Sequence, residues 1–145
     1  MMVNDLFKIG ELLSVHTQKS ELERKEAELT NPMLTNKEYI SLIFEWYCEL
    51  SGCNGRVCDL DTDNKMKFLI IILFLYSPVC FTGRRIVNGI RDILMELFGY
   101  KSSSGVSNHL KIAVYTYCTY KQFREEVNVL YPEIQNRLKA EGILP

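Results

Sequence analysis

The chain has 145 residues, of which 47% are hydrophobic and 24% charged, and its formal net charge is −1. These values are ordinary for a soluble globular protein, and the length suits one domain with a real core. The longest apolar run, FLIIILFLY at residues 68–76, is about half as long as a bilayer span, so we expect it to be a buried core helix and not a transmembrane one. The N-terminus shows no secretory signal.

Charge is unevenly distributed along the chain. Residues 1–65 hold 7 Lys/Arg and 12 Asp/Glu, a local charge of −5, whereas residues 82–124 hold 7 and 2, a local charge of +5. A basic centre in an acidic chain predicts a patch for an anionic partner. The alternative is that the oppositely charged parts neutralise each other in the fold.

Apolar residues follow a helical spacing along nearly the whole chain, and no stretch alternates over the length of a strand. The sequence therefore predicts an all-α fold, a compact multi-helix domain of six to eight helices. We predict helices at residues 3–15, 20–29, 35–50, about 63–76, 84–98, about 103–118, from 119 onward, and in a last segment that ends before Gly142.

Capping signals set several of these boundaries. Three pairs match the capping box, namely Ser20 with Glu23, Thr35 with Glu38, and Thr119 with Gln122. Pro132 fits the first turn of the last helix. Asn31-Pro32 interrupts the helical pattern. We therefore expect an N-terminal helical arm at residues 1–30 and a helical domain at residues 31–145.

The segment ELFGYKSSSGVSNHLK, residues 96–111, is the main candidate for function. Two helices joined by a short turn around a glycine are typical of a helix-turn-helix, which we place at about 84–118. In the second helix the apolar residues point inward, so Ser103, Ser104, Ser107, Asn108 and Lys111 face solvent.

Short polar side chains at a helix N-terminus suit a DNA reader. A recognition helix presents its N-terminal residues to base edges in the major groove, where Asn pairs with adenine and Ser forms hydrogen bonds with several bases. Arg84, Arg85 and Arg91 on the preceding helix, with Lys101 in the turn and Lys111, would neutralise phosphates.

The same residues carry a resemblance to known DNA-binding proteins. VSNHLK, residues 106–111, resembles the recognition helix of winged-helix repressors and related helix-turn-helix proteins. FGYKSSSGV, residues 98–106, is similar to the C-terminal DNA-binding domain of the bacterial replication initiator DnaA. This resemblance, over about 50 residues, implies that Lys101 contacts bases and that Ser102, Ser103, Ser104 and Gly105 occupy the polar contact positions that follow. Residues 112–145 lack the strand hairpin of a winged helix, and no GxxxxGK[ST] loop accompanies the motif.

Other chemistry has weaker support in the sequence. Cys48, Cys53 and Cys58 lack the close pairs of a structural zinc site, and residues 59–64 lack the glycine of a calcium loop. No G-x-S-x-G motif or pair of catalytic carboxylates stands out. We therefore expect no enzyme activity, no metal and no cofactor. With no export signal, we expect the five cysteines to be reduced and the location to be cytoplasmic.

Two functions remain open at this point. The first is a small helix-turn-helix protein that binds double-stranded DNA, as a transcriptional regulator or a replication, plasmid or phage maintenance factor. Its partners would be double-stranded DNA and a second copy of the chain, paired through the N-terminal helices, with no membrane partner. Val15, Leu22 and Leu29 fall seven residues apart, as in a coiled coil, but three positions are few, and a solvated helix at residues 20–29 is the favoured alternative. The second is an all-helical protein–protein interaction adaptor with no nucleic-acid role. The adaptor would have the arginines spread around the fold and paired with N-terminal acids.

Overall fold

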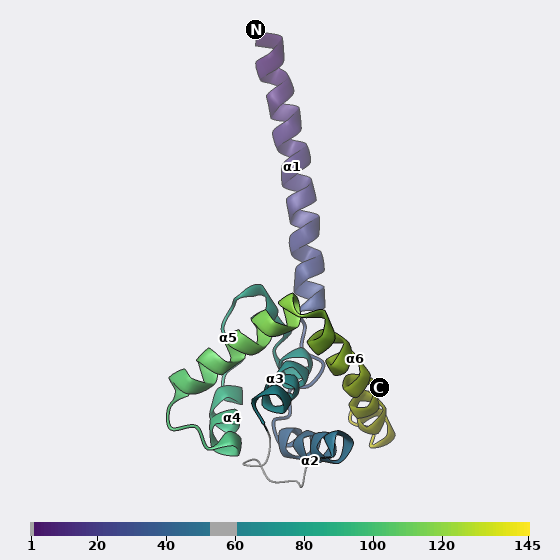
Figure 1. The fold of residues 1–145 in the computed structure, drawn as a ribbon. Helices are drawn as coiled ribbons and strands as arrows, with labels where there is room; N and C mark the ends of the chain where they lie inside the picture. Colours follow the sequence, from purple (N-terminus) through teal and green to yellow (C-terminus); the bar gives the residue numbers. More distant parts are fainter. Residues whose placement is uncertain (1, 53–60) are drawn as a thin grey trace. The chain divides into compact units, whose positions relative to one another are not determined.

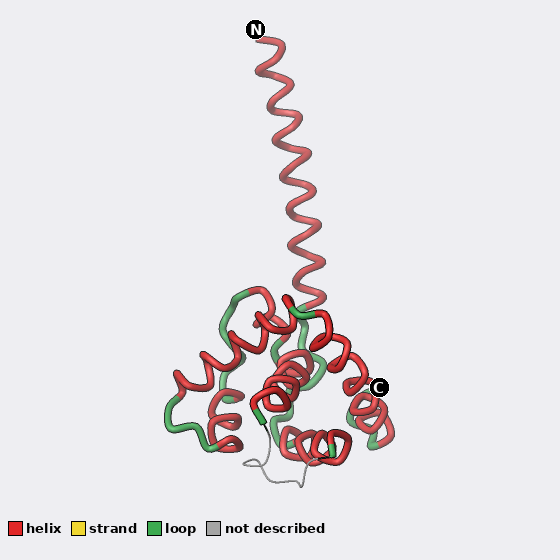
Figure 2. The backbone as a smooth tube through the Cα atoms, viewed as in Figure 1, coloured by secondary structure: helices red, strands yellow, loops and turns green. Residues whose placement is uncertain are grey.

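The computed structural model describes the backbone of residues 2–52 and 61–145, and side chains from residue 5 onward within those ranges. Its contacts divide the chain into two units, Met1–Asn31 and Pro32–Pro145. Figure 2 shows helices and loops, and no strand, in this described part. The predicted all-α class is therefore confirmed.

The first unit is one helix, α1 at Met2–Leu29. The division expected between residues 15 and 20 is absent, so Ser20 and Glu23 form no capping box. The physical reason is that no glycine or proline interrupts the chain there, and isolated polar residues do not end a helix. A single helix has no second element in its own unit to cover its apolar residues. Leu6, Phe7, Leu12 and Leu22 are all exposed.

The second unit contains five α-helices and one 3₁₀ helix in its described part (Figure 1). These are α2 at Tyr39–Ser51, α3 at Thr62–Tyr76, η2 at Pro78–Thr82, α4 at Ile90–Phe98, α5 at Ser103–Thr119 and α6 at Lys121–Ala140. Helix α3 packs against α2, η2, α5 and α6. Its residues 67–73 are all buried, which confirms that the apolar run forms a core helix.

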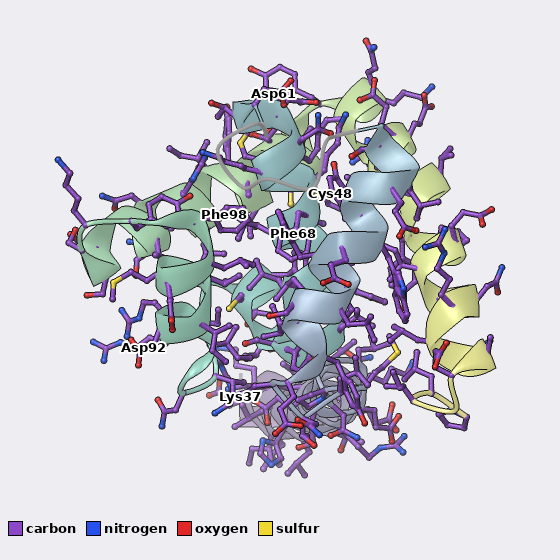
Figure 3. The ribbon with its side chains drawn as sticks, turned by 90° about the horizontal axis from the view of Figure 1, so that it is seen from below. Lys37, Cys48, Asp61, Phe68, Asp92 and Phe98 are labelled. Carbon is purple, nitrogen blue, oxygen red and sulfur yellow. The ribbon has the colours of Figure 1, made fainter. Side chains whose placement is uncertain are left out.

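Aromatic side chains join the elements around α3. The Phe68 ring meets the rings of Phe44, Tyr47 and Phe98 edge to face, at centroid separations of 5.2, 5.8 and 5.7 Å. Phe44 and Tyr47 come from α2, and Phe98 comes from the end of α4. Figure 3 shows Phe68 and Phe98 close together in the interior. This cluster fixes the C-terminal end of α4, the point from which the turn to α5 leaves.

Helix α4 begins later than the sequence predicted. The expected helix 84–98 starts at Ile90, and residues 84–87 are irregular backbone. Gly89 adopts a left-handed φ of +88°, which interrupts helical geometry. The backbone N–H of Val87 donates to the Ser77 hydroxyl at 3.1 Å, a bond that holds the segment against the start of η2. Arg84 and Arg85 therefore lie on a loop, not on a helix as predicted.

The last helix also departs from prediction. Pro132 lies inside α6 and does not start a new helix. A buried stripe of Phe123, Val127, Ile134 and Leu138 runs past the proline on one face. Packing of this stripe outweighs the one backbone hydrogen bond that a proline removes. Helix α6 ends before Gly142, as predicted.

Two other capping predictions are wrong. Helix α2 begins after Glu38, which makes no side-chain cap, and the Glu38 N–H donates to the Asn36 side chain at 3.0 Å. Tyr120 precedes α6 without a side-chain cap, so Thr119 and Gln122 do not form the expected box. Cys53, Cys58 and the start of the calcium-like stretch at residues 59–64 lie outside the described residues.

One lysine is held inside the second unit by two acids. The Lys67 ammonium lies 2.7 Å from the Asp63 carboxylate and also pairs with Glu126, so it joins α3 to α6. Burial lowers the pKa of Lys67, but its hydrogen bonds to the two carboxylates raise that pKa overall. The hydrogen bond from Lys67 in turn lowers the pKa of Glu126. Lys67 therefore serves to hold α6 against α3.

Candidate nucleic-acid interface

The turn between α4 and α5 spans residues 99–102. Gly99 ends α4 with a left-handed φ of +68°, and the Tyr100 N–H returns to the Met95 carbonyl at 3.0 Å. Ser102 then begins α5 as its N-cap, because its hydroxyl accepts the Gly105 N–H at 3.4 Å. Both ends of the turn are thus set by local hydrogen bonds.

Tyr100 holds this turn against α5. Its ring lies 6.0 Å from the Phe98 ring and 5.7 Å from the His109 ring, and its hydroxyl hydrogen-bonds to His109 Nδ1. Burial lowers the pKa of His109, and the nearby Lys65 lowers it further. His109 is therefore part of the support of the turn, a role the sequence did not indicate.

The two faces of α5 differ sharply in burial. Val106, Leu110 and Ala113 are buried against the core. Ser103, Ser104, Asn108 and Lys111 are exposed, as predicted. Ser107, which was also predicted to face solvent, is half-buried and accepts a hydrogen bond from Arg91. Ser104, Asn108 and Lys111 follow one another at spacings of four and three residues, so they form one polar strip along the solvent side.

Beside this strip lies a surface pocket of about 910 Å³. We call it the basic pocket. Three elements supply its polar lining: the loop after η2, helix α4 and helix α5. Among the residues that line it are Arg84, Arg85, Arg91, Ser107, Lys111 and Cys118. Four cations separated by up to 27 positions in the sequence thus meet around one hollow.

These four cations have few partners inside the protein. Arg91 donates to the Ser107 hydroxyl at 3.1 Å. Within residues 5–52 and 61–145, none of the ion pairs includes Arg84, Arg85, Arg91, Lys101 or Lys111. Unpaired guanidinium and ammonium groups around a hollow favour an anionic partner.

The remaining predicted residues do not line the basic pocket. Lys101 is exposed in the turn, and Ser102 acts as the N-cap of α5. The Ser104 hydroxyl lies 3.0 Å from the Ser102 hydroxyl. Ser103 and Asn108 are exposed on the first turns of α5. The predicted set therefore divides into a group at the pocket and a group at the N-terminal end of α5. The pocket group is Arg84, Arg85, Arg91, Ser107 and Lys111, and the other group is Lys101, Ser102, Ser103, Ser104 and Asn108.

Lys37 lies near the start of α4, outside the lining of the basic pocket, and the sequence did not predict its position there. Its ammonium lies against Gly89, directly before α4, where an added Cβ would collide with it. Lys37 comes from the chain before α2, far from the motif in sequence. No local pattern could have indicated this position, because only the tertiary packing brings it there.

The described residues contain no cluster of three or more His, Cys, Asp or Glu that could hold a metal ion. Within the same ranges, no helix combines the length and apolar character needed to cross a membrane. No protein-family model, curated protein or solved structure matches the chain.

Proposed function

We propose that this protein binds double-stranded DNA through the face formed by the N-terminal half of α5 and the basic pocket. One observation carries the proposal. Arg84, Arg85, Arg91 and Lys111 converge on one pocket, without an ion pair in the described structure, next to the polar strip of α5. Clustered unpaired cations are the electrostatic footprint of a phosphate-binding surface.

The arrangement of α4 and α5 supports a helix-turn-helix role for this pair. The turn at residues 99–102 is of the short, glycine-containing kind, about three to four residues long, that such motifs use. The first turns of α5 would enter the major groove, with Ser103, Ser104 and Asn108 facing base edges. These side chains are short and polar, so they would not obstruct close approach of the helix to the DNA.

Phosphate contacts would come from two sides of the recognition helix. Arg84, Arg85 and Arg91 would hold the backbone on the pocket side, together with Lys111 on α5 itself. Lys101 would contact the DNA from the turn. The exposed N-terminus of α5, capped by Ser102, adds free amides and a positive dipole.

The exposed apolar residues of α1 support dimer formation. Val15, Leu22 and Leu29 are 59%, 65% and 80% exposed and recur every seven residues. A second copy of α1 would cover them in a coiled coil, and a dimer would present two recognition helices to two half-sites. We propose that such a cytoplasmic dimer acts in transcriptional control or in replication, plasmid or phage maintenance.

The test is a fluorescence-anisotropy titration of the protein into a labelled mixed-sequence duplex at 50 and 200 mM salt. If about five phosphates are contacted, affinity should fall by about 10² to 10³ between these two salt concentrations. No binding at low salt with high-micromolar folded protein would contradict the proposal. It would favour the adaptor function instead.

A further inference from the structure

A second pocket adjoins the basic pocket. It has a volume of about 440 Å³ and lies among α3, η2, α5 and α6. Its lining is mainly apolar and includes Ile70, Ile71, Phe74, Phe81, Val127 and Tyr131. We call it the apolar pocket. Its volume falls within the range of about 300–1,000 Å³ that is typical of small-ligand sites.

The two pockets share part of their walls. Phe81 and Cys118 line both of them. Cys118 is an exposed residue near the end of α5, and Phe81 belongs to η2. A molecule that lay across these two side chains would therefore have one end among apolar groups and the other among arginines.

Contacts between its lining residues hold the walls of the apolar pocket in place. Phe74 and Tyr131 meet edge to face at a centroid separation of 5.0 Å, and the Tyr117 hydroxyl donates to the Asn128 side chain at 3.2 Å. Phe74 is 41% exposed although it belongs to the core helix α3. These contacts hold open a hollow that the neighbouring side chains do not fill.

We propose that the two pockets form one binding site for a single-chain anionic amphiphile of the fatty-acid class. The hydrocarbon chain would occupy the apolar pocket, and the carboxylate would lie among Arg84, Arg85 and Arg91 in the basic pocket. Charge complementarity selects this occupant, because a neutral apolar ligand would leave the adjacent arginines unused. Arginine is the side chain best suited to bind a carboxylate through two parallel hydrogen bonds. Arg84, Arg85 and Arg91 are also the arginines proposed to hold DNA phosphates, so DNA and the amphiphile would compete for them, and the site is tested in the absence of DNA.

Isothermal titration calorimetry with decanoate, below its micelle concentration, tests this site directly. We expect saturable binding with one decanoate per chain, and at least tenfold weaker binding of decanol. Shortening the chain to octanoate should weaken binding by about two- to fourfold for each methylene removed. Equal affinity for decanoate and decanol, or no binding of decanoate at millimolar concentration, would overturn the proposal.

Two pairs of variants locate the ligand. Cys118→Trp should fill the shared wall and reduce decanoate affinity at least tenfold, whereas Lys139→Trp, at an exposed position outside both pockets, should leave it unchanged. The double variant Arg84→Gln/Arg85→Gln should remove most of the preference for decanoate over decanol, and Lys139→Gln, outside both pockets, should retain it. Because Arg84 and Arg85 are exposed, their substitution keeps the test valid even if Cys118→Trp fails to fold. Unchanged selectivity in the folded arginine variant would overturn the placement.

Discussion

The second unit contains one buried lysine that is paired with acids and one group of cations that has no ion pair in the described residues. Lys67 is buried, with a side chain only 10% exposed, and two carboxylates neutralise it. Arg84, Arg85, Arg91 and Lys111 gather around the basic pocket without an ion pair in the described ranges. The first arrangement is complete without any partner. The second leaves positive charge concentrated at the surface, which is unfavourable unless an anion neutralises it.

We propose that this contrast separates structural charge from functional charge. A count of charged residues gives both groups the same weight, and net charge near zero conceals both. The environment of each cation distinguishes them, and in this proposal the paired cation contributes to stability and the unpaired cluster to binding. The predictions below test whether this division is correct.

The largest effect is expected from reversing two charges of the binding face. Arg91→Glu/Lys101→Glu should weaken binding to a mixed-sequence duplex about a hundredfold or more at 50 mM salt, because two phosphate contacts become repulsive. The free energy of unfolding, measured by urea denaturation, should fall by no more than about 1–2 kcal/mol, because the hydrogen bond from Arg91 to Ser107 is the one side-chain hydrogen bond lost among the described residues. Retained DNA affinity in the folded double variant would show that the face is placed wrongly.

Removal of the buried cation should lower stability and leave DNA affinity unchanged, unlike the charge reversal, which weakens DNA binding. Lys67→Met should lower the free energy of unfolding by about 1–2 kcal/mol, because the ion pairs that join α3 to α6 are lost and their carboxylates stay partly hydrated. Affinity for DNA should stay within about twofold of the original protein when binding is measured well below the unfolding transition. Weakened binding by this variant, with the fold intact, would place Lys67 on the binding face and break the division.

A single neutralisation on α5 should give a smaller effect. Lys111→Gln should lower DNA affinity a few-fold on every duplex tested and reduce the slope of log K against log salt by about one. Lys139→Gln, at the other end of the second unit's sequence, is the matched control. Its slope should equal that of the original protein. Equal slopes for both variants would remove Lys111 from the set of phosphate contacts.

The smallest effect concerns acid stability. Glu126 has its pKa lowered in the folded state below the ordinary value of 4.5, chiefly by its hydrogen bond to Lys67. Its contribution is therefore present above pH 4.5 and is lost as pH falls through the lowered folded-state pKa. Urea denaturation between pH 3 and 6 should show a shallower loss of stability in Lys67→Met than in the original protein. Identical pH profiles would show that the pair contributes nothing.

Much of the helical framework was predictable from the sequence. Helix α3 is a continuous apolar run that ends before Pro78, and α5 has a clear inward face. Gly52 and Gly99 both adopt the left-handed conformation that ends a helix. These features are local, because they depend on side-chain spacing and on backbone conformations that only a few residue types accept easily.

Other features depended on tertiary contacts. Pro132 is accommodated inside α6 because a buried stripe continues on both sides of it, and local propensity alone indicates a helix start there. Gly89 and the bond from Val87 to Ser77 keep Arg84 and Arg85 off α4. The residues of the candidate site were proposed from one motif. Only the tertiary structure shows that they gather at a pocket beside α5, because the packing of η2 against α3 and the bond from Val87 to Ser77 position the loop that carries Arg84 and Arg85.

The most direct test of the binding face is an amide chemical-shift titration of the labelled protein with a short DNA duplex at low salt. The account predicts that the largest shifts fall on residues 84–91 and 101–111, whereas Lys67, Glu126 and their neighbours stay unchanged. Shifts concentrated on α2 or α6, or no shifts with DNA in excess, would contradict the claim that the unpaired cations and the N-terminus of α5 form a DNA-binding surface.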